Sequence, residues 1–152
     1  MRFRGAWLLP AILLAFLLAG CSSKEETDGI SSTHVTLPNG KTITVEVMRK
    51  MVEIMKGMMF RDSLAQDRGM LFIHPKEDKY GYWMYQTRIP LDIIWMDHDR
   101  RIVEMSLETP PCTTKASECP QYGGTAASSF VLEINAGAAA RNGLKLGDVL
   151  GF

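Results

Sequence analysis

The sequence has few of the side chains on which most catalytic and metal sites depend. Its 152 residues include three cysteines and three histidines. The histidines, His34, His74 and His98, stand singly, without the spacing of metal ligands or of a catalytic base and its orienting partner. Glycine-rich phosphate loops, zinc-protease motifs and nucleophile elbows are also missing. The sequence therefore predicts no metal site and no cofactor, and it favours a protein that is not an enzyme.

An excess of charge of either sign is also missing. The 17 Lys and Arg residues balance the 17 Asp and Glu residues, so the formal net charge is zero. Nucleic-acid binding needs a basic stripe or patch, and we therefore expect no nucleic-acid partner. A hydrophobic content of 46% in a chain of this length is enough to fill one core. We expect one globular domain.

The longest apolar run stands at the start of the chain. Arg2 and Arg4 precede the apolar residues 6–18, a run of about 13 residues that is too short as a helix to cross a hydrocarbon core of ~30 Å. We expect residues 1–20 to be a signal peptide. The segment 18–21, Leu-Ala-Gly-Cys, resembles the lipobox of bacterial lipoproteins, which implies that Cys21 is lipidated and becomes the mature N-terminus. An ordinary cleaved signal and a short anchor are the alternatives.

The residues after Cys21 indicate how the domain is held. Ser22 stands where Asp would imply retention at the inner membrane, so we expect a lipid-anchored protein of the cell envelope, on the periplasmic face of the outer membrane if the cell is Gram-negative. Residues 21–33 are polar apart from Ile30 and are predicted to form the lipidated end and a flexible tether. The membrane is then a partner through the lipid on Cys21, and the globular domain spans 34–152.

Apolar periodicity predicts that this domain is mainly β. Alternating apolar residues on both sides of Pro-Asn-Gly at 38–40 predict a hairpin, and helical spacing over 49–60 predicts a short amphipathic helix that ends near Gly57. Further short apolar runs are 69–73, 80–84, 92–96, 101–107 and 130–134. The last features are a hairpin tip at 98–100, a helical turn over 136–142 and an edge strand over 146–149. We expect a mainly β (α+β) single domain with one or two short helices, as a compact antiparallel β-sandwich or barrel.

Two cysteines, Cys112 and Cys119, fall inside the predicted domain. In an exported chain such a pair predicts a disulfide. A disulfide that closes this loop of about eight residues would stabilise the fold by roughly 2–3 kcal/mol. A redox pair, which normally has C-x-x-C spacing, and a metal site, which needs two further ligands, are the alternatives.

Methionine is concentrated in one part of the chain. Nine of the ten methionines lie between Met48 and Met105. The spacings Met48-x-x-Met51 and Met55-x-x-Met58 would suit thioether pairs that hold Cu(I) on one helix face. Our first interpretation is structural, because flexible methionine side chains fill irregular cores beneath such a helix.

Polar and aromatic side chains meet in the segment 83–92. Trp83, Gln86, Thr87 and Asp92 form the mixture that lines small-ligand pockets. Asp92 begins an apolar strand, so its charge needs a partner, and Arg61 is the candidate.

Glu133 raises the same question, because it lies between Leu132 and Ile134. In a functional interpretation, Asp92 or Glu133 binds a polar ligand or acts as a general base. A hydrolase-like enzyme would use the two as a carboxylate pair. In a structural interpretation, Asp92 accepts hydrogen bonds from backbone amides and Glu133 points to solvent.

Together these motifs make the sequence resemble a family named domain of unknown function 192. The matching stretches are 57–61, 69–72, 82–84, Thr87, 89–94, 111–112, 119–120, Tyr122, 131–137 and 147–148. The resemblance implies a compact β-rich fold with a short helix, and it implies no known reaction. The sequence departs from the family pattern at Gln86, where Asn is usual, at Met58, where Leu is usual, and at Tyr82, where Phe is usual.

The sequence as a whole predicts an envelope lipoprotein that acts as a non-enzymatic, membrane-tethered binding or accessory module. Its partner would be a small molecule, a glycan or an envelope protein. The candidate ligand-binding residues are Arg61, Trp83, Gln86, Thr87, Asp92 and Glu133. The alternatives are the hydrolase-like enzyme with Asp92 and Glu133 and, less favoured, Cu(I) binding by methionines.

Overall fold

A computed structural model describes Met1 and residues 30–152 of the chain. The predicted signal peptide, the lipidation site Cys21 and most of the predicted tether lie outside the described residues. In the part that is described, no helix is long and apolar enough to span a membrane.

A six-stranded sheet with the strand order β1-β2-β3-β8-β5-β6 forms the body of the domain. Its strands are β1 (Ser32–Thr36), β2 (Thr42–Met48), β3 (Arg68–Asp78), β5 (Leu91–Met96), β6 (Ile102–Thr109) and β8 (Ser128–Asn135). Neighbouring strands are antiparallel except β2 and β3, which are parallel. A parallel pair needs a long crossover, and here the segment with helix α1 (Met51–Lys56) supplies it. The predicted mainly β (α+β) fold is confirmed, with this one parallel pair.

Smaller elements cover the sheet. β4 (Gly81–Trp83) and β7 (Gln121–Gly123) pair as a second, two-stranded sheet. Helix α2 (Ala138–Arg141) is the predicted helical turn, and a 3-10 helix, η1 (Ala116–Glu118), lies in the loop between the cysteines.

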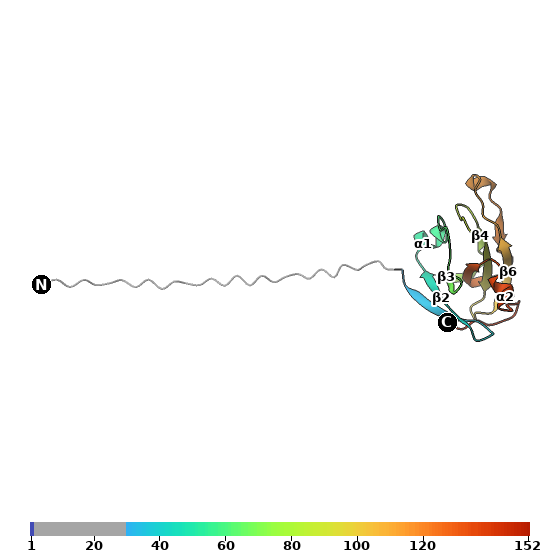
Figure 1. The fold of residues 1–152 in the computed structure, drawn as a ribbon, viewed down its shortest axis with the longest axis horizontal. Coiled ribbons are helices and arrows are strands. Elements are labelled where there is room, and N and C mark those ends of the chain that lie inside the picture. The colour runs from blue at the N-terminus through green and yellow to red at the C-terminus, as the bar shows by residue number, and fades with distance from the viewer. Residues whose placement is uncertain (2–29) are drawn as a thin grey trace.

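The C-terminal segment connects the two edges of the large sheet. Gly151 exchanges two backbone hydrogen bonds with Thr36 of β1, at 2.7 and 2.9 Å, and the Leu150 N–H donates to the carbonyl of Arg100 at the start of the β6 edge. The C-terminus accordingly lies near the end of β1, the blue strand, in Figure 1. The sheet is thereby closed into a barrel-like shape. The edge strand predicted over 146–149 is wrong, because this segment makes only isolated bridges, such as Arg101 with Val149.

Alternation along the strands places one apolar cluster on each face of the sheet. The inner core lies inside the closed sheet and contains Val35, Leu37, Ile43, Val45, Leu71, Ile94, Met96, Ile102, Leu132, Ile134, Ala138, Ala139, Leu144 and Leu150. The outer core lies on the opposite face and contains Met48, Met58, Met70, Phe72, Met84, Leu91, Ile93, Trp95, Cys112 and Val131. Residues from α1, β4 and β7 pack on the outer core. The candidate site lies in this outer layer.

Helix α1 differs from the prediction in what it buries. It ends at Gly57 as expected, but none of its own residues is buried, and Met51, Val52 and Met55 are 56–73% exposed. The core-filling interpretation is right for Met48 and Met58, which are buried, but these residues lie at the end of β2 and beyond the helix. Since the helix is only six residues long and ends at Lys56, Met48 and Met58 lie outside it, and the predicted placement of the four methionines on one helix face is wrong.

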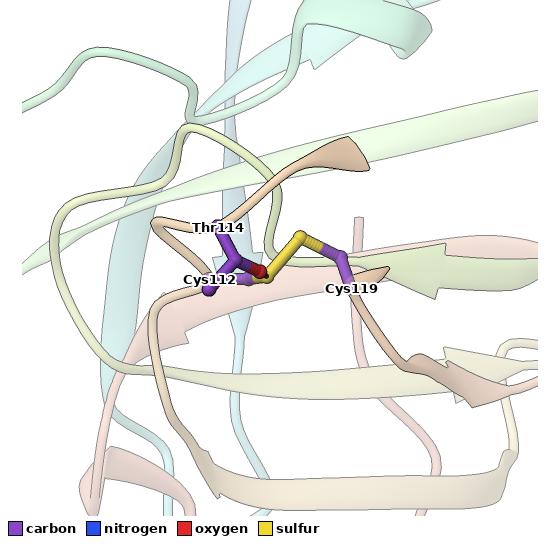
Figure 2. The surroundings of a disulfide bond; sticks show 3 residues. All are labelled: Cys112, Thr114 and Cys119. Atoms are coloured by element: carbon purple, nitrogen blue, oxygen red, sulfur yellow. Dashed lines mark hydrogen bonds between the residues drawn. A yellow bond between two sulfur atoms is a disulfide. The ribbon is translucent and has the colours of Figure 1, made fainter. Parts of the chain in front are cut away.

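Cys112 and Cys119 form a disulfide, as the sequence predicts (Figure 2). The Cys112 N–H donates to the Met84 carbonyl at 3.0 Å, and the Cys112 carbonyl accepts from the Gln86 N–H at 3.2 Å. The disulfide loop therefore fixes the backbone that follows Trp83, and it contributes to the shape of the outer layer.

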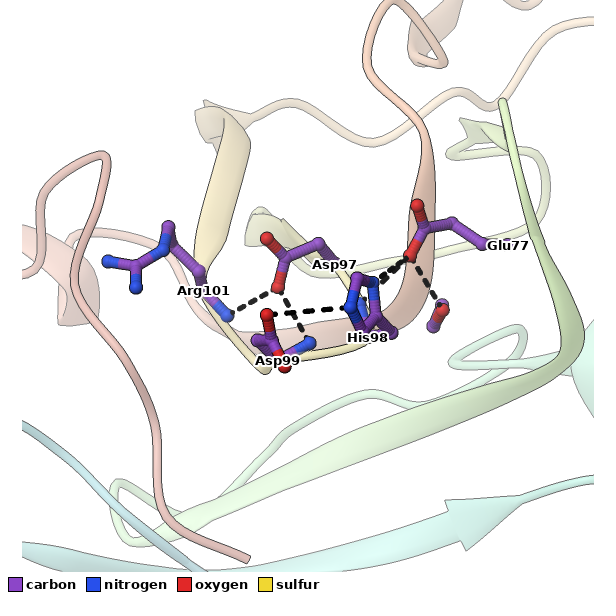
Figure 3. Close-up of polar contacts among 6 residues, drawn as sticks. Glu77, Asp97, His98, Asp99 and Arg101 are labelled. Atoms are coloured by element: carbon purple, nitrogen blue, oxygen red, sulfur yellow. Dashed lines mark hydrogen bonds and ion pairs between the residues drawn. The ribbon is translucent and has the colours of Figure 1, made fainter.

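The tip of the β5–β6 hairpin is held by two carboxylates (Figure 3). Asp97 accepts the N–H groups of Asp99 and Arg101, each at 2.9 Å. Glu77 of β3 accepts from the backbone and from the ring Nδ1 of His98, at 3.0 and 2.9 Å. The predicted tip at 98–100 is thus confirmed, and it is tied to a neighbouring strand.

Candidate ligand-binding site

Glu133 lies in the middle of the large sheet. Strand β8 pairs with β3 on one side and β5 on the other, and Glu133 stands opposite Met70 and Ile93. Its side chain points into the outer layer and is 4% exposed, so the predicted orientation towards solvent is wrong. Among the described residues, its Oε2 atom has no hydrogen-bond partner. The side chain is buried because α1 and the Trp83 segment cover this face of the sheet.

Burial decides the protonation state of Glu133. Loss of solvation raises the pKa of the Glu133 carboxyl to about 8, and the charge of Arg61 opposes this effect only in part. At neutral pH the group is therefore mostly protonated. A buried, neutral carboxyl group offers one O–H donor to whatever lies in front of it.

A small cavity lies in front of Glu133. Its volume is about 30 Å³, which is room for one or two water-sized groups. The cavity, which we call the Glu133 pocket, is lined by Ile54, Met55, Lys56, Gly57, Met58, Met59, Phe72, Tyr82, Trp83, Thr87 and Glu133. Of the six residues predicted to bind a ligand, the structure brings Trp83, Thr87 and Glu133 together here.

An apolar groove adjoins this pocket. The groove has a volume of about 210 Å³ and shares Ile54, Met55, Tyr82 and Trp83 with the pocket. Its remaining lining residues are Met51, His74, Tyr80 and Gly81. We call this feature the aromatic groove. His74 stacks on Tyr80 at 3.5 Å between ring centroids, and its Nε2 lies 3.1 Å from the Tyr82 hydroxyl, so the wall is held by ring contacts.

Arg61 does not pair with Asp92, and that prediction is wrong. Its two terminal nitrogens each lie 2.6 Å from an oxygen of Glu46, in a bidentate ion pair. The hydrogen bonds to Glu46 raise the pKa of Arg61. Glu46 and Glu133 both stand opposite Met70 in the sheet register, and Arg61 lies near enough to affect both charges. The alternation of β2 could have revealed Glu46, which lies between Val45 and Val47.

Asp92 serves the other face of the sheet. It is fully buried, and its Oδ1 accepts the N–H groups of Glu108 and Gly137 at 2.8 and 3.1 Å. Its Oδ2 accepts the Ala139 N–H at 2.8 Å. Asp92 therefore anchors the start of α2, as an acidic residue at a helix N-terminus does.

The hypothesis of a carboxylate pair is wrong. Asp92 stands opposite Ile134, and Glu133 stands opposite Ile93, one residue further along each strand. Because successive residues of a strand point to opposite faces, the two carboxyl groups lie on opposite sides of the sheet. No cleft can lie between them.

Gln86 acts through its backbone. It has a positive φ of 56°, and its carbonyl accepts the Phe60 N–H at 2.9 Å. This contact joins the turn after α1 to the segment after Trp83. The Gln86 side chain is not part of the pocket lining.

The other cavities and side-chain clusters of the described residues offer fewer groups that could bind a ligand. A cavity of about 730 Å³ lies between the start of β1, the hairpin tip and Phe152, and none of the unpaired buried polar atoms found among residues 30–152 lines it. Within residues 30–152, no group of three or more His, Cys, Asp or Glu side chains is placed to hold a metal ion.

Comparison with known proteins identifies the family. The sequence model of DUF192, described as "Uncharacterized ACR", matches residues 34–152. The chain belongs to this family. No curated protein matches the chain.

Two solved structures share the fold of this DUF192 chain. A protein of unknown function from Novosphingobium aromaticivorans is 33% identical, with a TM-score of 0.74, over 84% of this chain and 89% of that one. A protein from Sinorhizobium meliloti, described as a putative transcription regulator, is 28% identical, with a TM-score of 0.73, over 81% and 95% of the two chains.

The DUF192 motifs converge on the Glu133 pocket. Eight of its eleven lining residues lie in the stretches through which the sequence resembles the family; they are Gly57, Met58, Met59, Phe72, Tyr82, Trp83, Thr87 and Glu133. Met58 and Tyr82, two departures from the family pattern, both stand in its wall. The remaining three lining residues come from α1.

Proposed function

We propose that this protein is a membrane-tethered binding module of the cell envelope, and that its ligand is a small, largely apolar molecule with an uncharged oxygen acceptor. The observation that carries the proposal is the buried Glu133 carboxyl, whose Oε2 has no partner among the described residues and faces a cavity. Burying a polar group without a hydrogen bond costs roughly 1–3 kcal/mol. A ligand oxygen in the pocket would remove that cost.

The charges around the pocket favour an uncharged ligand. Glu133 is mostly protonated at neutral pH, because its pKa is about 8, and it can donate to a carbonyl or ether oxygen. Lys56 lines the pocket, and Arg61 lies near Glu133. An ammonium group in the pocket would be repelled by these cations, and a carboxylate would leave its second oxygen among apolar side chains.

The aromatic groove would hold the apolar body of the ligand. It shares four residues with the pocket, so a molecule could place an oxygen against Glu133 and its apolar part between α1 and Trp83. The pocket and groove together have a volume of about 240 Å³, just below the lower end of ~300 Å³ for drug-sized sites. The ligand is therefore expected to be small.

The membrane tether in this proposal comes from the sequence. The lipobox-like segment before Cys21 and the polar residues 22–29 would hold the domain at the envelope membrane. Mass spectrometry of the mature N-terminus tests this part, and an unmodified Cys21 would refute lipid anchoring.

The ligand site is tested with three probes of similar size, which are benzamide, benzylamine and benzoate. We expect benzamide to shift the indole NMR signal of Trp83 at about pH 6, and to lose affinity as the pH rises through the Glu133 pKa of about 8. Benzylamine and benzoate should bind more weakly. Glu133→Gln keeps a donor, so it should bind benzamide at all pH values tested, whereas Glu133→Leu should not bind it.

A matched pair of variants on α1 controls for indirect effects. Met55 lines both the pocket and the groove, whereas Val52 lines neither. Met55→Trp should therefore block benzamide binding, and Val52→Trp, which adds the same side chain to the same helix, should not. If none of the three probes shifts Trp83 at any pH, the proposed ligand site is wrong.

A further inference from the structure

Helix α1 and the turn after it expose an apolar surface. Met51, Val52, Met55 and Phe60 are 69%, 73%, 56% and 53% exposed, and we call them the α1 patch. Helix α1 buries none of its residues. The other large apolar side chains exposed in the folded domain, such as Leu107 and Leu146, are not grouped on one short helix. A group of exposed apolar side chains of this kind marks an interaction surface.

The described part of the domain begins beside this patch. Ile30, itself 53% exposed, and Val52 line the same surface depression of about 180 Å³. In Figure 1, α1 lies near the start of β1, the blue strand. The segment that leads to Cys21 therefore joins the domain next to the α1 patch.

The length of that segment limits how far the patch can lie from the membrane. Residues 22–29 separate Cys21 from Ile30. Eight residues reach at most ~30 Å when fully extended and span roughly 15 Å as a random coil. A domain attached at Cys21 would therefore keep the α1 patch close to the headgroups of the bilayer.

Cationic residues accompany the apolar patch. Arg49 and Lys50 precede the helix, and Lys56 forms its last turn. The one acidic side chain on α1, Glu53, accepts the N–H groups of Arg49 and Lys50, at 3.1 and 3.0 Å, and its Oε1 lies 3.7 Å from the Lys50 Nζ, so Arg49 and Lys56 are the cations that Glu53 does not pair with. Basic residues beside exposed apolar side chains are the combination that binds anionic lipid surfaces.

We infer that the α1 patch docks on an anionic lipid surface, with its apolar side chains at the headgroup boundary and Arg49 and Lys56 near lipid phosphates. This inference rests on the proposed membrane attachment, since the position of Ile30 matters only if the preceding segment leads to a membrane. A protein partner and a second copy of the chain are the other possible occupants, and the experiment distinguishes them.

The experiment uses the chain from residue 22 to 152, without the lipid. Both cores lie within residues 35–150, so this part is expected to fold by itself. We expect it to sediment with vesicles of phosphatidylcholine and phosphatidylglycerol at low salt, and to bind at least about tenfold more weakly to pure phosphatidylcholine or in high salt.

Two matched variants test the surface itself. Val52→Asp should weaken binding to the anionic vesicles about tenfold, because it removes an apolar contact and adds a negative charge. Leu146→Asp makes the same change at a residue that is 61% exposed but lies outside the patch, and it should bind like the wild type. Circular dichroism of both variants confirms that they are folded.

Several results would overturn the inference. They are an absence of vesicle binding at low salt, equal binding to neutral vesicles, and an equal loss for both variants. Sedimentation velocity would also overturn it if it showed a dimer that Val52→Asp dissociates while vesicle binding is unchanged. Failure of the proposed function gives different results, because Val52 lines neither the pocket nor the groove and lipidation of Cys21 is measured on the full-length product.

Discussion

Glu46 and Glu133 lie two strands apart on the same face of the sheet, but Arg61 forms its ion pair with Glu46 and not with Glu133. Both stand opposite Met70 in the register, and the bidentate contact of Arg61 is made to Glu46. Glu46 is partly exposed, whereas Glu133 is buried. The fold therefore neutralises one acid by an ion pair and the other by protonation, and this difference can be measured.

The free energy of unfolding of the wild type should decrease as the pH rises through the range in which Glu133 is protonated in the native state but ionised in the unfolded chain. Its pKa rises on folding from 4.5 to about 8, so the native state binds the proton more tightly. The stability that Glu133 gains from this proton is fully present below the pKa of the unfolded chain. It decreases by up to about 1.4 kcal/mol per pH unit between the unfolded and the folded pKa, and it levels off above the folded pKa. Urea unfolding at several pH values measures it.

Glu133→Gln provides the comparison for this prediction. Because Gln carries no titratable proton, the variant should gain stability relative to the wild type as the pH rises from about 5 to the native pKa of about 8. Glu118→Gln, at an exposed site, should show no such trend. A stability difference for Glu133→Gln that does not depend on pH would contradict the assigned burial.

Asp92→Asn should destabilise the fold by about 2–4 kcal/mol. Asp92 accepts three backbone N–H groups, from Glu108, Gly137 and Ala139. An amide has one acceptor oxygen, so at least one N–H would face the new NH₂ group. Urea unfolding at neutral pH gives the loss, and a change below about 0.5 kcal/mol would be inconsistent with this anchoring role.

Gln86→Asn should stabilise the protein by up to about 1 kcal/mol. Gln86 has a φ of 56°, a left-handed conformation that is costly for most side chains and better tolerated by Asn. Gln121→Asn in strand β7 is the control and should give no gain, and thermal unfolding compares the two. An equal effect at both positions would argue against the backbone explanation.

The His98 ring at the hairpin tip should titrate with a raised pKa. The hydrogen bond to Glu77, followed by the charges of Asp99 and Glu77, raises the pKa of the His98 ring above its ordinary value. An NMR titration of the ring protons should show this, and Glu77→Gln should bring the pKa back towards about 6.5. A His98 pKa that is the same in both proteins would mean that the contact in Figure 3 does not persist in solution.

Part of the candidate site was predictable from local sequence. Trp83, Thr87 and Glu133 place polar groups in or near apolar segments of the sequence, and they line one pocket. The ion pair of Arg61 was predicted wrongly, because Asp92 and Glu46 are equally plausible acids when only spacing is known. The choice depends on which face of the sheet each one occupies, and on the parallel register of β2 and β3.

The sequence by itself determined the β-rich class, the first hairpin, the end of α1 near Gly57 and the disulfide, because each follows from periodicity, turn residues or cysteine pairing over short distances. Tertiary structure alone decided that Glu133 is buried and Asp92 anchors α2, and that the methionines of α1 are exposed. These outcomes depend on what covers each face of the sheet. The segments that cover each face, such as α1 and the disulfide loop, are distant in the chain from the strands they cover. Local sequence patterns therefore do not predict where they pack.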